Sequence, residues 1–344
     1  MSGREDLVRG VLKLVPGVLV LVAAGVLSRW IAAGIPHVSH LIVAIVLGIV
    51  AANAIEVPPL LEKGISRTYG LWLETGIVVL GARVVISDIT RVGPGLLVVV
   101  CGYLLFTVLL TEFLSRLLRV DRKLGSCLAA GTSVCGVSAI IATGGGIDVD
   151  RRHLAVATAI VLLFDMVTVL SYPLLPAVFG IPDAVYGAWA GLSMFSTGTS
   201  VAAGFAVSEV AGQWATVVKM SRNAFIGVWA LLYTIYYLKP GTPEAAADEE
   251  SEGTIAYLWA RFPKMIVGFV IVAAVANLGM LTESQITAMK NVYEWLFVMA
   301  FVGLGFNITP ESLEDFRFRP LLVVLIVFVV ASVSSFAAVR LVFR

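Results

Sequence analysis

The chain has 344 residues, of which 59% are hydrophobic and only 14% are charged, and its mean hydropathy is +0.97. Soluble domains carry about 25% charged residues, so this composition excludes a soluble enzyme or a secreted disulfide scaffold. The net charge of +1 also excludes nucleic acid as a partner, because binding to phosphates requires an excess of basic residues. A polytopic membrane protein is the class that fits.

Apolar segments long enough to cross or enter a bilayer follow one another along the chain. A span needs about 20 mostly apolar residues, and about eleven segments approach that length. They cover residues 10–28, 38–54, 70–87, 94–118, 124–145, 153–180, 185–206, 214–238, 257–281, 289–308 and 320–342. The acidic linker 241–253 is expected to be a solvated loop. We therefore expect an all-α, multi-pass protein of the plasma membrane.

Basic residues indicate which ends face the cytoplasm, because Lys and Arg in short loops resist translocation. The densest cluster follows the fourth segment and comprises Arg116, Arg119, Arg122 and Lys123. Counting spans from this cluster places the N-terminus, with Arg4 and Arg9, in the cytoplasm, and Arg319 on the same side. Arg151 and Arg152 would then lie outside. Either that loop is an exception to the rule, or the fifth segment is a re-entrant hairpin.

Two segments are too rich in glycine and hydroxyl residues for ordinary lipid-facing helices. They are residues 125–146 and 191–204. Glycine lowers helix propensity by ~1 kcal/mol per position, and hydroxyls can bond backbone groups that a break sets free. Close packing of continuous helices would use the same small residues, but two such stretches, each with several hydroxyls, favour interrupted helices.

Interrupted helices suit an anion, because their N-terminal ends carry partial positive charge. The candidate substrate-binding residues in the two stretches are Thr132, Ser133, Cys135, Gly136, Ser138, Ser196, Thr197, Thr199 and Ser200. Lys219 and Arg222 share one helix face and, with Asn223, could balance the charge of a small oxyanion or carboxylate. Alternatively, the two cations reach to lipid headgroups. Metal and cofactor sites are not expected, because no cluster of suitable ligands occurs.

Acids inside membrane segments are candidates for coupling to protons, because intramembrane charge is costly. Asp165 lies within a wholly apolar run, and Glu74 lies in the third segment nearer the membrane edge. Asp165 is the better candidate, although a structural bond to a neighbouring helix would also account for it. Motifs of hydrolases, metalloproteases or nucleotide-binding loops are missing from the polar stretches. We therefore expect no catalytic residues.

Residues 131–140, Gly-Thr-Ser-Val-Cys-Gly-Val-Ser-Ala-Ile, are similar to the signature of the YeiH-type family, to which sulfate export is ascribed. Residues 187–193, 201–204 and 218–223 resemble the second half of the same family. Where the family commonly has His and Asp, this chain has Phe195 and Ser196. Histidine and aspartate would be natural proton carriers, so transport is expected either to be uncoupled exchange or to depend on Asp165.

The resemblance implies an architecture related to cation/proton antiporters and bile-acid-type symporters. An extra N-terminal helix in 1–37 would precede two five-helix repeats, 38–182 and 183–344, which are inverted because an odd number of spans separates them. Segments five and ten would be the broken, crossing helices, with the second break near 302–310. The substrate site would lie at the midplane between segments five, seven and ten.

The implied function is a secondary transporter of a small anion that works by alternating access. An anion channel or a membrane receptor could use the same polar cavity without a transport cycle, and both alternatives stay open. The expected partners are the anionic substrate, the lipid bilayer and a second copy of the chain in a homodimer.

Overall fold

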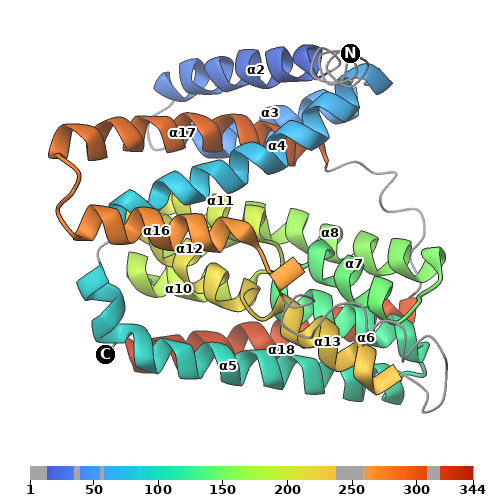
Figure 1. The fold of residues 1–344 in the computed structure, drawn as a ribbon. Helices are drawn as coiled ribbons and strands as arrows, with labels where there is room; N and C mark the ends of the chain where they lie inside the picture. The colour runs from blue at the N-terminus through green and yellow to red at the C-terminus, as the bar shows by residue number, and fades with distance from the viewer. Residues whose placement is uncertain are drawn as a thin grey trace, which may run out of the picture. The chain divides into compact units, whose positions relative to one another are not determined.

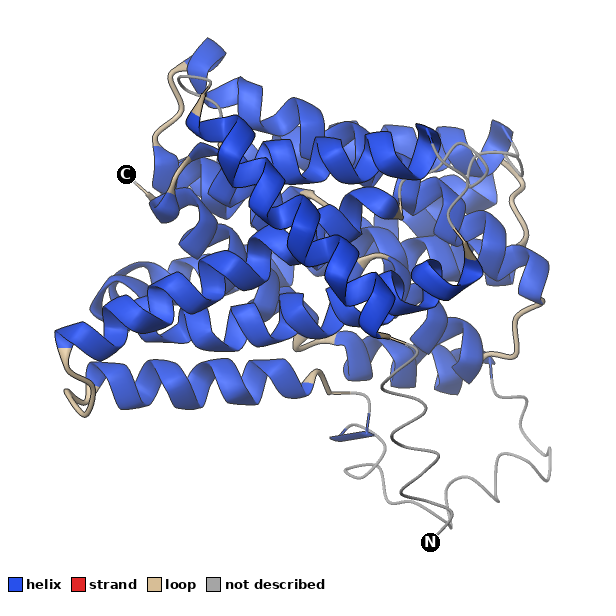
Figure 2. Ribbon diagram, turned by 90° about the horizontal axis from the view of Figure 1, so that it is seen from above, coloured by secondary structure: helices blue, strands red, loops and turns tan. Residues whose placement is uncertain are grey.

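The computed structural model describes residues 14–34, 39–54, 58–84, 86–237, 259–260, 262–307 and 318–343. In these ranges every regular element is a helix, and Figure 2 shows no strand among them. The expected all-α fold is therefore confirmed for these ranges. The acidic loop 241–253 and the N-terminal Arg4 and Arg9 lie outside the described residues.

Several helices have the length and composition of membrane spans. Four are long enough to cross a bilayer and comprise Val15–Ala33, Gly93–Leu117, Arg151–Phe179 and Phe318–Val342. Shorter apolar helices cover His40–Ala54, Val137–Gly146, Thr197–Val207 and Lys264–Asn277. These helices agree with a multi-pass membrane protein, whereas the number of eleven spans stays a prediction.

The helices form two compact units, each assembled from separate stretches of the chain. The first unit comprises Met1–Ile86, Phe205–Gln213 and Met265–Glu311. The second unit comprises Ser87–Gly204, Trp214–Lys264 and Ser312–Arg344. This division groups residues by spatial contact and does not test the predicted sequence repeats, 38–182 and 183–344, which stay a prediction.

Long apolar helices make up the first unit. They are α2 (Val15–Ala33), α3 (His40–Ala54), α4 (Pro59–Leu80), α16 (Lys264–Asn277) and α17 (Glu283–Phe306), with a short 3-10 turn, Gly81–Arg83, after α4. Helix α17 packs against α2, α3 and α4, which lie together in Figure 1. The side chains of Thr282 and Gln285 form a capping box that fixes the start of α17.

The predicted break near 302–310 in the tenth segment is only partly covered by the structure: no break occurs from Val302 to Phe306, where α17 ends. Helix α17 is continuous from Glu283 to Phe306 and passes through Gly303 and Gly305 without interruption. A Cβ atom added to Gly305 would lie 2.9 Å from the Cα atom of Gly48 on α3. The glycine therefore allows two backbones to approach closely. Residues 308–310 of the predicted break lie outside the described ranges.

The second unit contains long and short helices packed around an apolar core. They are α5 (Ile86–Leu117), α6 (Arg122–Ala130), α7 (Val137–Gly146), α8 (Arg151–Ser171), α9 (Leu175–Phe179), α10 (Asp183–Ser193), α11 (Thr197–Val207), α12 (Glu209–Asn223), α13 (Ile226–Tyr237) and α18 (Phe318–Val342). A 3-10 turn, Tyr172–Leu174, joins α8 to α9, and the adjoining ends of α11 and α12 belong to the first unit. Within the second unit, α10 packs against α18 and α13 packs against α7.

Both polar stretches are interrupted helices, as the sequence predicted. Helix α6 continues into a π-helical turn, Gly131–Cys135, and Gly136 then breaks the helix before α7 begins. Helix α10 ends at Ser193, and α11 begins at Thr197 after three residues outside any helix. A π-helical turn within a helix is uncommon and often marks a functional site. The same unit therefore holds two breaks in helices that are otherwise buried.

Candidate functional site

The two helix breaks lie against each other. A Cβ atom added to Gly136 would meet the Oγ atom of Ser196 and would lie 3.4 Å from its Cα atom. Gly136 also has a φ of +72°, a conformation that residues with a side chain rarely adopt. Glycine is therefore required at position 136 for two reasons. It can adopt the positive φ, and its missing side chain leaves room for Ser196 in the second break.

Arg222 on α12 bonds to the backbone of both interrupted helices, and it is fully buried. Its Nε and Nη2 atoms donate to the carbonyl of Ser133 at 2.9 and 2.6 Å, and Nη2 also donates to the carbonyl of Thr132 at 3.1 Å. Its Nη1 atom donates to the carbonyls of Gly191, Leu192 and Met194. These carbonyls lie where two half-helices end and lack their usual partners, so the guanidinium neutralises two negative helix ends.

Lys219 lies one turn before Arg222 on the same face of α12, and it is also fully buried. Its Nζ atom donates to the carbonyl of Met194 at 2.7 Å and to the carbonyl of Phe195. Both carbonyls belong to the break between α10 and α11. Neither cation extends to lipid headgroups, since both side chains bond to buried backbone.

Asp165 on α8 caps the second half-helix, and its side chain is buried. Its Oδ1 atom accepts from the backbone N–H of Ser196 at 3.1 Å and from the hydroxyl of Thr199 at 2.9 Å. Its Oδ2 atom is buried and has no hydrogen-bond partner among the described residues. In the same turn, Asn223 donates to the hydroxyl of Thr197 at 2.9 Å. The N-terminal end of α11 is therefore occupied by a carboxylate.

We refer to Asp165, Lys219 and Arg222 as the buried charge cluster. Each of the three is at most 3% exposed. Two cations against one carboxylate leave one net positive charge inside the second unit. Burying charge is costly unless it is compensated. The face of Tyr103, 5.0 Å from the Arg222 Cζ atom, adds a weak cation–π contact and no formal negative charge.

The other candidate residues in the two stretches bond mainly to their own helices. The hydroxyls of Thr132, Ser133 and Ser200 each donate to a carbonyl three or four residues earlier, at 2.9, 3.3 and 2.8 Å. Cys135 is buried at the end of the π-helical turn, whereas Ser138 is exposed. These hydroxyls therefore form hydrogen bonds with backbone carbonyls of the interrupted helices, as expected for residues next to a break.

Sequence reasoning missed an ion-pair cluster in the first unit. Arg83 donates to the Oε1 atom of Glu209 through Nε and Nη2 at 3.0 and 2.8 Å, and Lys290 donates to its Oε2 atom at 2.7 Å. The hydroxyl of Tyr293 donates to Oε1 at 3.2 Å. We call these four residues the Glu209 cluster. No spacing rule could have joined Arg83 to a residue 126 positions away.

Glu74, the second predicted coupling residue, is exposed on α4 in the first unit. Asp165 belongs to the second unit. The two candidates therefore do not belong to one compact unit, and only Asp165 contacts an interrupted helix.

Comparison with known proteins gives one family. The family model described as Conserved hypothetical protein 698 matches residues 16–324. A UPF0324 membrane protein from Nitratidesulfovibrio vulgaris is 28% identical over 92% of this chain and 89% of its own length. A UPF0324 membrane protein from Bacillus cereus is 29% identical over 87% and 86%, and one from Oceanobacillus iheyensis is 30% identical over 87% and 86%. No solved structure matches this chain.

Proposed function

The chain belongs to the family described as Conserved hypothetical protein 698, which is the predicted YeiH-type family, and from that premise we propose that it is a secondary transporter of a small anion. The relatives are named membrane proteins, and the chain has the apolar helices of one. The proposed substrate is a sulfate-like oxyanion or a carboxylate that crosses the plasma membrane by alternating access.

The single observation that carries the proposal is the net positive charge of the buried charge cluster. Two cations and one carboxylate are at most 3% exposed, so their formal charges sum to +1, and the other groups that offset the cations within the unit are backbone carbonyls at helix ends. Binding one small anion would restore neutrality in a medium where an unpaired charge is expensive. A bound cation would increase the imbalance. The sign of the cluster therefore favours an anionic substrate.

The two half-helix N-termini differ in a way that favours one position for the anion. Asp165 already caps the start of α11. The start of α7 follows Gly136, which has no side chain to cap it, and in its first turn the N–H of Ala139 bonds to the Cys135 thiol. Its backbone N–H groups carry the positive end of the helix dipole, and Ser196 lies beside Gly136. We place the anion at the start of α7, where Lys219 and Arg222 act on it through their charge rather than by direct bonds.

A ligand screen by thermal shift tests this proposal on the purified full chain. Sulfate, phosphate, acetate and other small anions are added singly, and a bound anion should raise the melting temperature by a few degrees at saturation. Lys219→Gln should lose most of this shift, because it removes the net positive charge. Lys123→Gln is the matched control, since Lys123 also donates to a backbone carbonyl, that of Asp148 at 2.6 Å, but lies outside the cluster.

The control decides between binding and general salt effects. Equal shifts for the native chain and for Lys219→Gln would assign the stabilisation to salt and remove the basis of the anion site. The anion site would be supported if the melting temperature of Lys123→Gln still rose on adding the anion and that of Lys219→Gln did not.

If transport is coupled to protons, we propose that Asp165 is the residue that binds and releases the proton. Asp165→Asn keeps an oxygen that can cap α11 but removes the group that exchanges a proton. Anion flux into liposomes is measured with and without an imposed pH gradient. A gradient-driven flux that survives in Asp165→Asn would contradict the role of Asp165, and a flux independent of the gradient in both proteins would favour uncoupled exchange. Glu74→Gln is the comparison variant in the first unit.

A further inference from the structure

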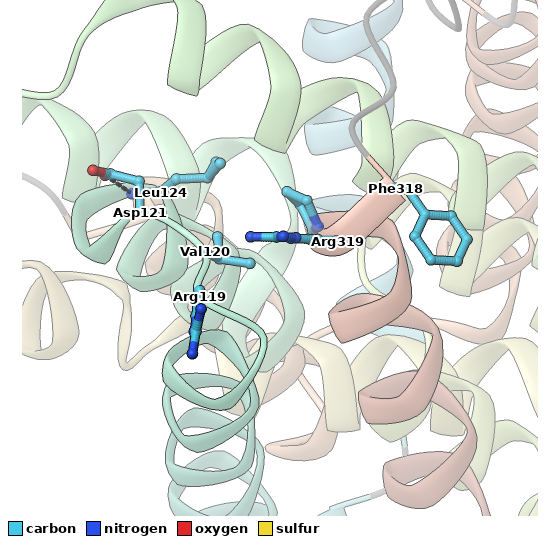
Figure 3. Close-up of a pocket in the computed structure, with 7 residues that line it drawn as sticks. Arg119, Val120, Asp121, Leu124, Phe318 and Arg319 are labelled. Atoms are coloured by element: carbon cyan, nitrogen blue, oxygen red, sulfur yellow. Dashed lines mark hydrogen bonds between the residues drawn. The ribbon is translucent and has the colours of Figure 1, made fainter.

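A pocket of about 470 Å³ lies at one end of the second unit, away from the residues of the buried charge cluster. The turn after α5 and the first residues of α18 line it, namely Arg119, Val120, Asp121, Leu124, Phe318, Arg319 and Pro320. Figure 3 shows Arg319 extending from the start of α18 toward Val120. Two arginines that are far apart in the sequence therefore share one pocket.

The charge of this pocket is positive. Arg119 and Arg319 are both exposed, and neither forms an ion pair with another described residue. The one acid in the lining, Asp121, uses its Oδ1 atom to accept from the N–H groups of Lys123 and Leu124 at 3.0 and 3.1 Å. Its carboxylate caps α6, so it is engaged in its own helix.

Arg119 occupies a backbone position that ordinarily favours glycine. Its φ is +55°, and the N–H of Val120 donates to the carbonyl of Ser115 at 2.8 Å, which closes the end of α5. In this kind of helix ending the residue with positive φ is usually glycine. The backbone at Arg119 therefore carries a local conformational cost, and Figure 3 shows its side chain extending from this turn along α5, whereas Arg319 extends toward Val120.

The pocket joins the ends of two helices that are long and apolar enough to cross a membrane. The apolar span of α5 ends at Leu117, and the span of α18 begins at Phe318. Because the pocket joins these two ends, both lie at the same face of the membrane. The positions of Arg119 and Arg319 agree with the sequence expectation that they share the cytoplasmic side, where anionic lipids give a negative surface potential.

We propose that this pocket binds the phosphate group of an anionic phospholipid in the cytoplasmic leaflet. The guanidiniums of Arg319 and, after a rotamer change of the exposed Arg119 side chain, of Arg119 bond to the phosphate oxygens, as arginine does in phosphate recognition generally. The apolar lining of Val120, Leu124 and Phe318 contacts the glycerol and the first acyl carbons. A soluble phosphate would use only the two arginines.

The test measures binding of phosphatidylglycerol to the full chain in neutral phosphatidylcholine nanodiscs. Each cation near an anionic lipid contributes roughly fivefold to affinity, so the double variant Arg119→Gln and Arg319→Gln should bind about 25-fold more weakly. Arg340→Gln is the matched control, because Arg340 is an exposed arginine in the last turn of the same helix, α18. Affinity equal to that of the native chain in the double variant would overturn the proposal.

A second variant separates binding from folding. Arg119→Gly removes the guanidinium and restores glycine at the position with positive φ, so it should melt no lower than the native chain in neutral lipid while binding phosphatidylglycerol more weakly. If Arg119→Gly bound phosphatidylglycerol as tightly as the native chain, Arg119 would not be part of the binding site.

Inorganic phosphate distinguishes the two sources of the phosphate group. It should fail to displace phosphatidylglycerol, because it lacks the contacts with the apolar lining. Displacement at comparable concentrations would contradict the lipid assignment and indicate a soluble phosphate compound.

Discussion

The buried charge cluster and the Glu209 cluster both gather cations and a carboxylate, but they compensate charge in opposite ways. In the Glu209 cluster, Glu209 bonds directly to Arg83 and Lys290, and the three side chains are 28 to 36% exposed. In the buried charge cluster, Lys219 and Arg222 donate to backbone carbonyls instead. The Glu209 cluster is held together by bonds between side chains. The buried charge cluster is held by bonds from side chains to the backbone of interrupted helices.

This difference indicates which cluster is suited to a ligand. Partly exposed ion pairs are solvated and contribute little energy. The side chains of the buried charge cluster are shielded from bulk solvent, so a ligand of opposite sign has a large effect there. Substitutions in the buried charge cluster should therefore change both stability and anion binding, while those in the Glu209 cluster should change stability only.

The largest effect is expected from Arg222→Gln. The substitution leaves several carbonyls of two half-helices without donors, and we expect a loss of roughly 3–5 kcal/mol in the free energy of unfolding. Denaturant titration of the detergent-solubilised chain measures it. Arg222→Lys keeps the charge and should lose less. If Arg222→Gln were as stable as the native chain but failed to bind anions, Arg222 would be a substrate ligand and would not hold the two half-helices together.

An intermediate effect is expected from Gly136→Ala. The added Cβ atom meets Ser196 and the backbone keeps a positive φ, so we expect a loss of about 1–3 kcal/mol. Gly145→Ala is the matched control on α7, because the space beside Gly145 is open. Combining Gly136→Ala with Ser196→Gly should recover part of the loss. Strictly additive losses in the double variant would show that the two breaks are not in contact.

The smallest effect is expected from Glu209→Gln. It removes the charge that pairs with Arg83 and Lys290 but keeps a hydrogen-bonding side chain, and partly exposed pairs contribute about 0.2–1 kcal/mol each. We expect a loss of about 1 kcal/mol and an unchanged thermal shift on adding anion. A loss of anion binding in Glu209→Gln would contradict the separation of roles between the two clusters.

The comparison of segments five, seven and ten shows what the sequence could and could not predict about the fold. Glycine and hydroxyl residues together predicted interrupted helices within 125–146 and 191–204, and the structure has the interruptions at 131–136 and 194–196. In α17, by contrast, Gly305 lies against Gly48, and the helix is continuous as far as Phe306. A glycine in a helix serves either a break or a close approach, and only the neighbouring helix decides which.

The candidate site was predictable in its residues but not in its bonds. The buried position of Asp165 agrees with the expectation from its apolar surroundings, and Lys219 and Arg222 are buried on the helix face that their spacing predicted. Their partners could not be read from the sequence, because Arg222 bonds to backbone atoms 28 to 90 positions away. Backbone carbonyls carry no sequence signal, so an arginine that neutralises helix ends looks the same in sequence as one that binds an anion.

Counterflow in proteoliposomes tests the central claim most directly. Vesicles with the native chain are loaded with the unlabelled anion that gives the largest thermal shift, and uptake of the same anion in labelled form is followed. A carrier with one anion site predicts saturable uptake that transiently exceeds equilibrium, and Lys219→Gln should abolish it. Uptake that is unsaturated, shows no overshoot and is equal in Lys219→Gln would indicate a channel and contradict the proposed carrier.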